Sequence, residues 1–341
     1  MAVNWSRTML GAAGAGGAAV GSYIMIGNTS GTVYLLDHTT KGSLSLADSY
    51  SLGNQIFDFA FTPDGKYIAA TSPFGGTTGT TYMFDHTTKG TLSLASTYSS
   101  GGGYGCAWTS DGSYLATGFG RSGNPIYLLS HSNGTLSSQD TQSMSGYGSV
   151  GSFSPNDSYL TAHGTSSPYF TLLTHSSGNL SSGSTFSTVG EMPIFNQNCT
   201  WSPDNNYIAV AQDGSPYFRL LSRSGSSVSS AATLTLARGR AAAFSPDGNY
   251  IAFTNDNYNP GVRLIERTNN TTISQVATIS TPNAAASIDW SPDGQYIGVT
   301  SQSNKFKLID HTSAGSMSEA DTYDFPSGEF GFYARPAFSP D

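Results

Sequence analysis

The sequence predicts an all-β protein, a seven-bladed β-propeller built from four-stranded antiparallel blades. The first observation is an eight-residue pattern: an aromatic residue, Ser/Thr-Pro-Asp-Gly, a polar residue, Tyr, and Ile or Leu. Its clearest copy spans residues 244–251. Related copies begin at Phe61, Trp108, Phe153, Trp201, Phe244 and Trp290, with a last, cut-off copy at Phe338. Intervals of 43 to 48 residues separate them, a regularity typical of repeat architectures.

The second observation is the content of each repeat, which divides into four short strands. In the second repeat we expect strands at residues 56–61, 67–70, 81–84 and 91–96. Thr62-Pro63-Asp64-Gly65 turns the chain between the first two, because Pro presets φ and Gly accepts the positive φ of a tight hairpin. Residues 85–90 form a second turn, before the fourth strand. Four short antiparallel strands at this period describe one propeller blade.

The third observation is a packing pattern in the first strand of each repeat. The residue before each aromatic is small in six cases and an aspartate in one: Ala60, Ala107, Ser152, Thr200, Ala243, Asp289 and Ala337. Alternate side chains of a strand face opposite sides of a sheet. Each blade therefore offers a ring on one face and a hollow on the other, and we expect the ring of one blade to sit in the hollow of the next.

The two ends of the chain complete one copy of the pattern between them. Residues 338–341 stop within it, and residues 21–24 continue it from the point of the break. We expect strands near residues 23–26, 33–36 and 44–50 to form a blade with an innermost strand near residues 334–338. Tyr23, Phe338 and Asp341 mark this three-plus-one closure, which pairs both exposed edges. The predicted domains are a flexible Gly/Ala-rich docking arm, residues 1–20, and a propeller, residues 21–341.

Composition limits the classes of partner. Charged residues make up 11% of the chain and the formal net charge is −8, which argues against a nucleic-acid groove or an anionic membrane surface. No stretch of 18 apolar residues is present, so no membrane insertion is expected. Cys106 and Cys199 occupy equivalent places in two different repeats, which predicts buried free thiols rather than a disulfide. A reducing compartment is therefore permitted.

Five of the six histidines share one position in the repeat, and arginines fill it in the two remaining blades. We call these the rim residues: His38, His86, His131, His175, Arg223, Arg267 and His311. Equal spacing around a ring would separate them too far for metal binding, which needs three or four ligands within a few ångströms. Two interpretations stay open: a side chain that stabilises the hairpin between third and fourth strands, or a pH-sensitive rim that meets a partner.

Other candidate chemistry is weak. His163 lies outside the repeat register, and a lone histidine is poor evidence for catalysis. The repeated aspartates of the turns are explained by hydrogen bonds to their own backbone, because no dense acidic loop of the calcium type is present. Neither a Gly-x-Ser-x-Gly elbow nor a phosphate-binding loop occurs. We therefore predict no catalytic residue, no metal and no cofactor.

Departures from the repeat are better guides to function. The arm carries a small amphipathic cluster, interpreted either as a disordered terminus or as a docking segment: Trp5, Arg7, Met9 and Leu10. Two irregular stretches, residues 189–197 and 324–333, combine aromatic side chains with a carboxylate. Their candidate residues are Glu191, Phe195, Phe325, Glu329 and Phe330. We expect both stretches near a channel mouth, as binding surfaces or as packing between blades.

The repeat resembles seven-bladed propellers of the WD40-like and YVTN/lactonase type across residues 21–341. The Ser-Pro-Asp-Gly-x-Tyr-Ile turn and the Asp-His-Thr-Thr-x-Gly-x-Leu segments, residues 37–44 and 85–92, look like the lactonase-type blade. The Trp-Asp dipeptide that names WD40 repeats is absent. Separately, residues 5–14 resemble the N-termini of structural proteins in marine tailed bacteriophages.

Three functions compete on this basis. The leading one is a non-enzymatic structural or recognition propeller of a bacteriophage virion, associated with capsid or tail. It would be anchored to other virion proteins through residues 1–20, present in many copies, and would meet a host surface protein or glycan. The second is a lactonase-like hydrolase acting on a sugar lactone at the channel mouth, and the third is a cytoplasmic protein-interaction scaffold.

Overall fold

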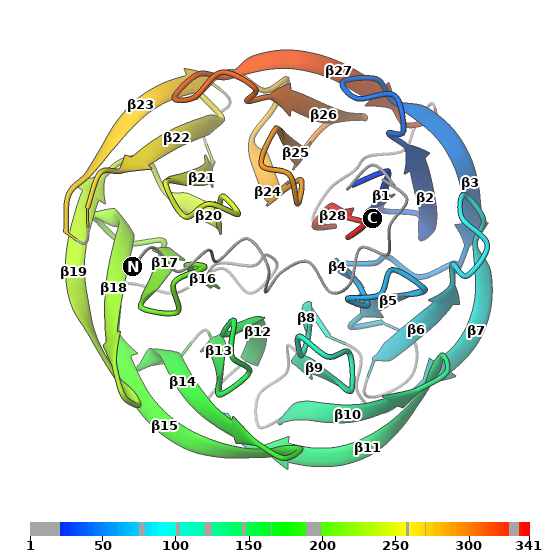
Figure 1. The fold of residues 1–341 in the computed structure, drawn as a ribbon, viewed down its shortest axis with the longest axis horizontal. Helices are drawn as coiled ribbons and strands as arrows, with labels where there is room; N and C mark the ends of the chain where they lie inside the picture. The colour runs from blue at the N-terminus through cyan, green and yellow to red at the C-terminus, as the bar shows by residue number, and fades with distance from the viewer. Residues whose placement is uncertain are drawn as a thin grey trace, which may run out of the picture.

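The protein is an all-β ring of seven blades (Figure 1), seen here in a computed structural model. The structure describes residues 21–74, 79–99, 103–118, 125–144, 148–164, 166–188, 199–256, 259–269, 271–326 and 334–341. Each blade is a sheet of four strands, and every strand pair in it is antiparallel. The predicted fold class is confirmed. Within the described residues, no helix is long and apolar enough to cross a membrane.

We number the blades in chain order from the composite blade, which is blade 1. Blades 1 and 2 contain β28 (Ala337–Phe338), β1 (Tyr23–Gly27), β2 (Thr32–Asp37), β3 (Ser45–Ser51), β4 (Asp58–Phe61), β5 (Tyr67–Ser72), β6 (Thr80–Asp85) and β7 (Ser93–Tyr98). Blades 3 and 4 contain β8 (Gly105–Trp108), β9 (Tyr114–Gly118), β10 (Ile126–Ser132), β11 (Thr135–Gln142), β12 (Gly148–Phe153), β13 (Tyr159–Gly164), β14 (Tyr169–Ser176) and β15 (Asn179–Ser187).

Blades 5 to 7 follow the same plan. Blades 5 and 6 contain β16 (Cys199–Trp201), β17 (Tyr207–Ala211), β18 (Tyr217–Ser224), β19 (Ser227–Thr235), β20 (Gly239–Phe244), β21 (Tyr250–Asn255), β22 (Val262–Arg267) and β23 (Ile273–Ile279). Blade 7 contains β24 (Ala285–Trp290), β25 (Tyr296–Ser301), β26 (Lys305–Asp310) and β27 (Ser318–Asp324). In Figure 1 the first strand of each blade lies nearest the centre and the fourth forms the perimeter.

The fourth strand of the second repeat starts two residues later than the sequence predicts, at Ser93 instead of Thr91. The displaced residues complete the preceding hairpin. The Thr91 backbone N–H donates to Thr88 O at 3.2 Å, and the Leu92 N–H donates to the Asp48 carboxylate of blade 1 at 2.7 Å. These two N–H groups are therefore not available to the sheet, and strand pairing begins after them.

The aromatic residues of the repeat pack between blades, as the small residue before each one indicates. Each ring lies against the blade that precedes its own in the chain. The Trp290 indole donates to Ala243 O at 2.9 Å, and the Trp108 indole donates to Ala60 O at 3.0 Å. Phe338 likewise packs on Phe306 of blade 7. In both hydrogen-bonded cases the indole thus binds the small residue of the preceding blade.

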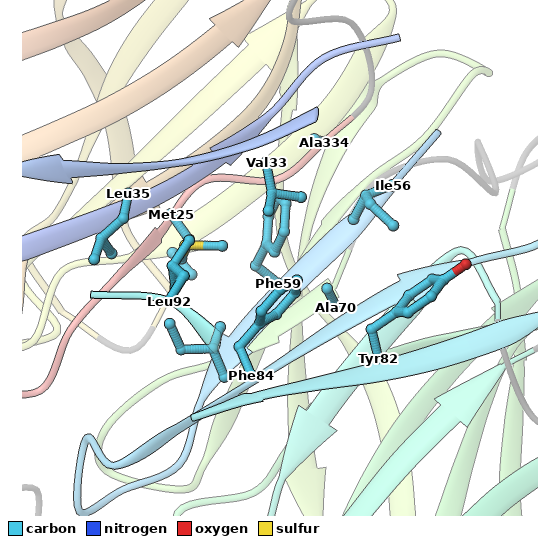
Figure 2. Packing of buried hydrophobic residues seen from close by; sticks show 12 residues of the cluster. Met25, Val33, Leu35, Ile56, Phe59, Ala70, Tyr82, Phe84, Leu92 and Ala334 are labelled. Carbon is cyan, nitrogen blue, oxygen red and sulfur yellow. The ribbon is translucent and has the colours of Figure 1, made fainter. Parts of the chain in front are cut away.

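The interface between blades 1 and 2 shows how these contacts form a core (Figure 2). Met25 and Val33 of blade 1 face Phe59 and Phe84 of blade 2, and all four side chains are fully buried. Fully buried aromatic and aliphatic side chains contribute roughly 1.5–3 kcal/mol each to folding. The propeller core is therefore a set of layers between neighbouring sheets.

The predicted closure is present. The pairs Ile24↔Phe338 and Met25↔Ala337 attach β28 to β1. Beyond this ladder, the Ser22 N–H donates to Asp341 O at 2.7 Å, and the Ser339 N–H donates to Tyr23 O at 2.8 Å. A ladder of two residue pairs thus joins the two ends of the chain. The two hydrogen bonds of Ser339 and Asp341 extend this ladder toward the C-terminus. Cys106 and Cys199 are buried free thiols, as predicted.

Replacing Phe338 by Ala should lower the free energy of unfolding by about 3–5 kcal/mol, because it leaves a cavity between blades 7 and 1. The side chain is only 7% exposed. The matched control is Phe74→Ala, because that ring is 47% exposed and its loss should cost less than about 1 kcal/mol. Urea unfolding measures both variants, and equal losses would contradict the packing described above.

Candidate functional site

The blade topology gives the ring two unlike faces. The turns between first and second strands and the hairpins between third and fourth strands lie on one, which we call the turn face. The loops between second and third strands and the links between blades lie on the other, which we call the connection face. Each blade repeats this order of strands, so the assignment holds around the ring.

The rim residues lie on the turn face, where six of the seven side chains link the third-to-fourth-strand hairpin to the first turn of their own blade. In six blades, a side-chain nitrogen lies 2.7 to 3.3 Å from a backbone carbonyl of the first turn. Those carbonyls belong to Gly21, Gly112, Asp157, Asn205, Gly248 and Gly294. His86 instead uses Thr91 O, at 3.0 Å. Hydrogen bonds to a turn hold it in one geometry.

Each rim residue also contacts the repeat tyrosine of the preceding blade. Five imidazole rings meet a tyrosine ring edge to face with centroids 4.8 to 5.6 Å apart, and two guanidinium groups lie 4.9 and 5.0 Å from a tyrosine centroid. The partners in chain order are Tyr296, Tyr23, Tyr67, Tyr114, Tyr159, Tyr207 and Tyr250. One pair therefore bridges each of the seven boundaries between blades.

Burial favours the neutral form of two of these imidazoles. His38 and His86 are fully buried, and burial lowers the pKa of both. In His38 the second ring nitrogen accepts the Gly42 N–H at 3.0 Å, which requires a neutral ring. These are the contacts of side chains that stabilise turns and blade interfaces. The alternative role of the rim, contact with a partner, stays a prediction.

A cluster of charged side chains lies on the inner strands where the ring closes, and sequence reasoning missed it. Arg335 of blade 1 lies 3.7 Å from a carboxylate oxygen of Asp58 in blade 2 and 3.7 Å from one of Asp289 in blade 7. Asp58 also accepts the backbone N–H of Cys106, in blade 3, at 2.8 Å. One guanidinium therefore connects three blades. The one sign of this cluster in the sequence was Asp289, the charged residue among the small residues that precede the repeat aromatics.

Burial dominates the acidity of this cluster. It raises the pKa of Asp58 from 3.8 to about 6, although Arg335 and the N–H donors of Cys106 and Phe59 oppose the shift. Burial likewise raises the pKa of Asp289 and that of the Cys106 thiol. At neutral pH the Asp58 carboxyl group is mostly ionised, because the pH exceeds its pKa of about 6, so the cluster holds the Arg335 cation beside a carboxylate, and the Cys106 thiol has no nucleophilic character.

A second buried polar contact joins His163 to Cys199. The cysteine sulfur lies 3.5 Å from His163 Nδ1, and both residues are fully buried. A thiol beside an imidazole is a familiar nucleophile pair, but burial raises the pKa of Cys199 to about 12. The sulfur is therefore a thiol, and the contact belongs to the interface between blades 4 and 5.

The other predicted site residues divide in two groups. Phe325 is buried, with its ring centroid 5.6 Å from that of Tyr34 in blade 1, so it packs between blades 7 and 1. The remaining ones lie outside the described residues: Trp5, Arg7, Met9, Leu10, Glu191, Phe195, Glu329 and Phe330. Among the residues that the structure does describe, no group of three or more His, Cys, Asp or Glu side chains could hold a metal ion.

Comparisons with known proteins identify the fold alone. The sequence matches no family model and no curated protein. Among solved structures, it is similar to a protein from Lactobacillus plantarum, with a TM-score of 0.78 at 17% identity, covering 93% of this chain and 99% of the other. A periplasmic gluconolactonase from Pseudomonas aeruginosa has a TM-score of 0.71 at 16% identity, covering 89% and 96%.

A third similar structure is the β-propeller domain of Cps50 (Swd1) from Myceliophteria thermophila, with a TM-score of 0.64 at 13% identity, covering 82% of this chain and 90% of the other. The chain therefore has a seven-bladed propeller fold with lactonase-like structural neighbours.

Replacing Asp58 by Asn should remove a pH dependence of stability. The pKa of Asp58 in the fold, about 6, exceeds the unperturbed value of 3.8, so the folded state binds the proton more tightly. The contribution of Asp58 to stability is therefore fully present only below pH 3.8, and about 3 kcal/mol of it is lost as the pH rises past about 6. Asn cannot ionise, so between pH 4 and pH 7 the difference in the free energy of unfolding between Asp58→Asn and wild type should change by most of that amount, about 2 kcal/mol.

Urea unfolding between pH 4 and pH 7 measures this difference. Asp85→Asn is the control. Hydrogen bonds to Thr87 lower the pKa of Asp85, so the free-energy difference between Asp85→Asn and wild type should change with pH in the opposite direction. A constant difference for Asp58→Asn across this range would refute the prediction.

Proposed function

We propose that the chain is a non-enzymatic structural or recognition module of a bacteriophage virion, with the propeller anchored through residues 1–20. The observation that carries the non-enzymatic part is the use of ionisable side chains within the fold. The rim residues bridge blades, the two cysteines are buried thiols with raised pKa, and Arg335 links two carboxyl groups. Among the described residues, the groups that suggested chemistry thus have structural partners.

The anchoring part rests on the sequence of the arm. Trp5, Met9 and Leu10 supply apolar area that a partner would bury, and Arg7 supplies a charge beside it. Residues 5–14 resemble the N-termini of structural proteins in tailed bacteriophages, and the Gly/Ala run that follows suits a flexible tether. The propeller would then present one face outward to a host surface protein or glycan.

Removing residues 1–20 should abolish incorporation into virions while leaving the propeller folded. The tests are immunogold labelling of purified particles, which should label wild-type virions, and thermal unfolding of the truncated protein, which should match that of the full chain. Intact particles that carry no label would refute the proposal. Incorporation that survives truncation would favour a docking face on the propeller, as expected of a cellular interaction scaffold.

A lactonase-like hydrolase is the second candidate, favoured by the gluconolactonase among the structural neighbours. Fold alone does not confer activity, so the candidate needs residues of its own. Glu191 and Glu329 lie in the irregular stretches that precede β16 and β28, Arg335 lies just before β28, and Asp289 lies on β24, the inner strand of blade 7. A carboxylate near a channel mouth would be the general base that activates water.

Gluconolactone opening, followed by proton release, should stay at the uncatalysed rate in wild type and in Glu191→Gln and Glu329→Gln. This outcome follows if the propeller is a binding module. Turnover by wild type that either substitution lowers by about 100-fold or more would instead establish the hydrolase.

A further inference from the structure

One position of the third strand divides the ring into two parts. It lies four residues before the rim residue and pairs with the same position of the second strand in every blade. From blade 1 to blade 7 it holds Tyr34, Tyr82, Tyr127, Thr171, Arg219, Arg263 and Lys307. Three successive blades thus carry a cation where the others carry a hydroxyl. Figure 1 shows the three strands concerned, β18, β22 and β26, in neighbouring blades.

The lysine in this row is neutralised. Lys307 Nζ lies 2.6 Å from the Glu319 carboxylate and donates to Ser280 O at 3.1 Å. Its charge therefore has a partner, and its ammonium group links blade 7 to the end of β23 in blade 6. Lys307 serves the same structural purpose as the tyrosine hydroxyl of Tyr82, which accepts a hydrogen bond from Asn54 of the preceding blade at 3.2 Å.

The two arginines differ, because a glutamine holds each of them. Arg219 Nε donates to Gln212 Oε1 at 3.0 Å, and Arg263 Nη1 donates to Gln275 Oε1 at 2.5 Å. Among the described residues, neither guanidinium has a carboxylate within ion-pair distance, and both side chains are partly exposed, although Arg263 Nε itself is buried. An amide oxygen orients a guanidinium without cancelling its charge, so the remaining N–H donors stay available to an anion.

The surroundings add to this positive charge. Arg238 and Arg240 lie where the chain passes from blade 5 to blade 6, and they form ion pairs with Asp213 and Asp256. With Arg219 and Arg263 this makes four arginines against two aspartates, on a chain whose formal net charge is −8. Among the described residues, the connection-face end of blades 5 and 6 thus carries an excess of positive charge.

We propose that Arg219 and Arg263 are two anion-binding subsites that together bind a carboxylate-bearing polysaccharide. A planar carboxylate matches the paired N–H donors of a guanidinium. Two subsites on adjacent blades suit a polymer with a repeated charge. The neighbouring strand β19 contains several Ser and Thr residues, whose hydroxyls suit sugar hydroxyls. Two unneutralised arginines are too few for nucleic acid, which requires many phosphate contacts.

Binding of polygalacturonate, measured by calorimetry at low salt, tests the proposal. Arg219→Gln and Arg263→Gln should each raise Kd by about 10-fold, and the double variant should show no measurable binding. The control, Lys66→Gln, removes the same charge from an exposed side chain on the turn face and should leave Kd unchanged. Thermal unfolding checks that each variant folds. In a separate measurement on the wild type, 0.5 M salt should abolish binding of polygalacturonate, as expected of charge recognition.

Four results would overturn it: no binding of polygalacturonate by wild type, equal binding by the double variant, equal loss in Lys66→Gln, or equally tight binding of neutral dextran. Tighter binding of single-stranded DNA than of polygalacturonate would assign the surface to nucleic acid and also overturn it. The proposal does not require the chain to belong to a virion, so its failure leaves the proposed function unaffected.

Discussion

The contact on which the structure depends is the packing of one blade against the next. A four-stranded sheet with apolar side chains on both faces cannot bury them alone, and a row of such sheets leaves two faces uncovered. A closed ring covers them all. The aromatic side chains of Phe338 and Trp290 pack against residues of the preceding blade, as every repeat aromatic does. The repeated pattern therefore forms the interfaces between successive blades, and closure of the propeller forms the remaining interface, between blades 7 and 1.

Closure also explains the placement of the charged cluster. Blade 1 joins the two ends of the chain through a ladder of two residue pairs, which is little to hold a ring together. Arg335 lies just before that ladder and reaches carboxyl groups in the blades on both sides. A buried ion pair adds little net stability, but it penalises arrangements that leave a charge unpaired. The cluster thus favours docking of β28 in its proper register over other ways of closing.

The sequence predicted the architecture well because its signals are local. Turn residues, alternating strands and the row of small residues all act within one blade and recur in the rest. The interactions of Arg335 were not predicted, because they join residues from three blades whose proximity depends on closure. The rim residues fall between these cases. Their shared position was visible in the sequence, but the tyrosine that each one contacts belongs to another blade.

The same distinction separates structure from function within a blade. On the turn face, the rim residue of each blade contacts the repeat tyrosine of the preceding blade, so a change at either position weakens an interface. The third-strand position of Arg219 and Arg263 is different, because tyrosine, threonine and lysine also occupy it without altering the strand pairing. Where the backbone tolerates several side chains, a new charge can appear without loss of the fold. Glutamine partners that orient the charge and leave it uncancelled suit binding of a ligand better than they suit packing.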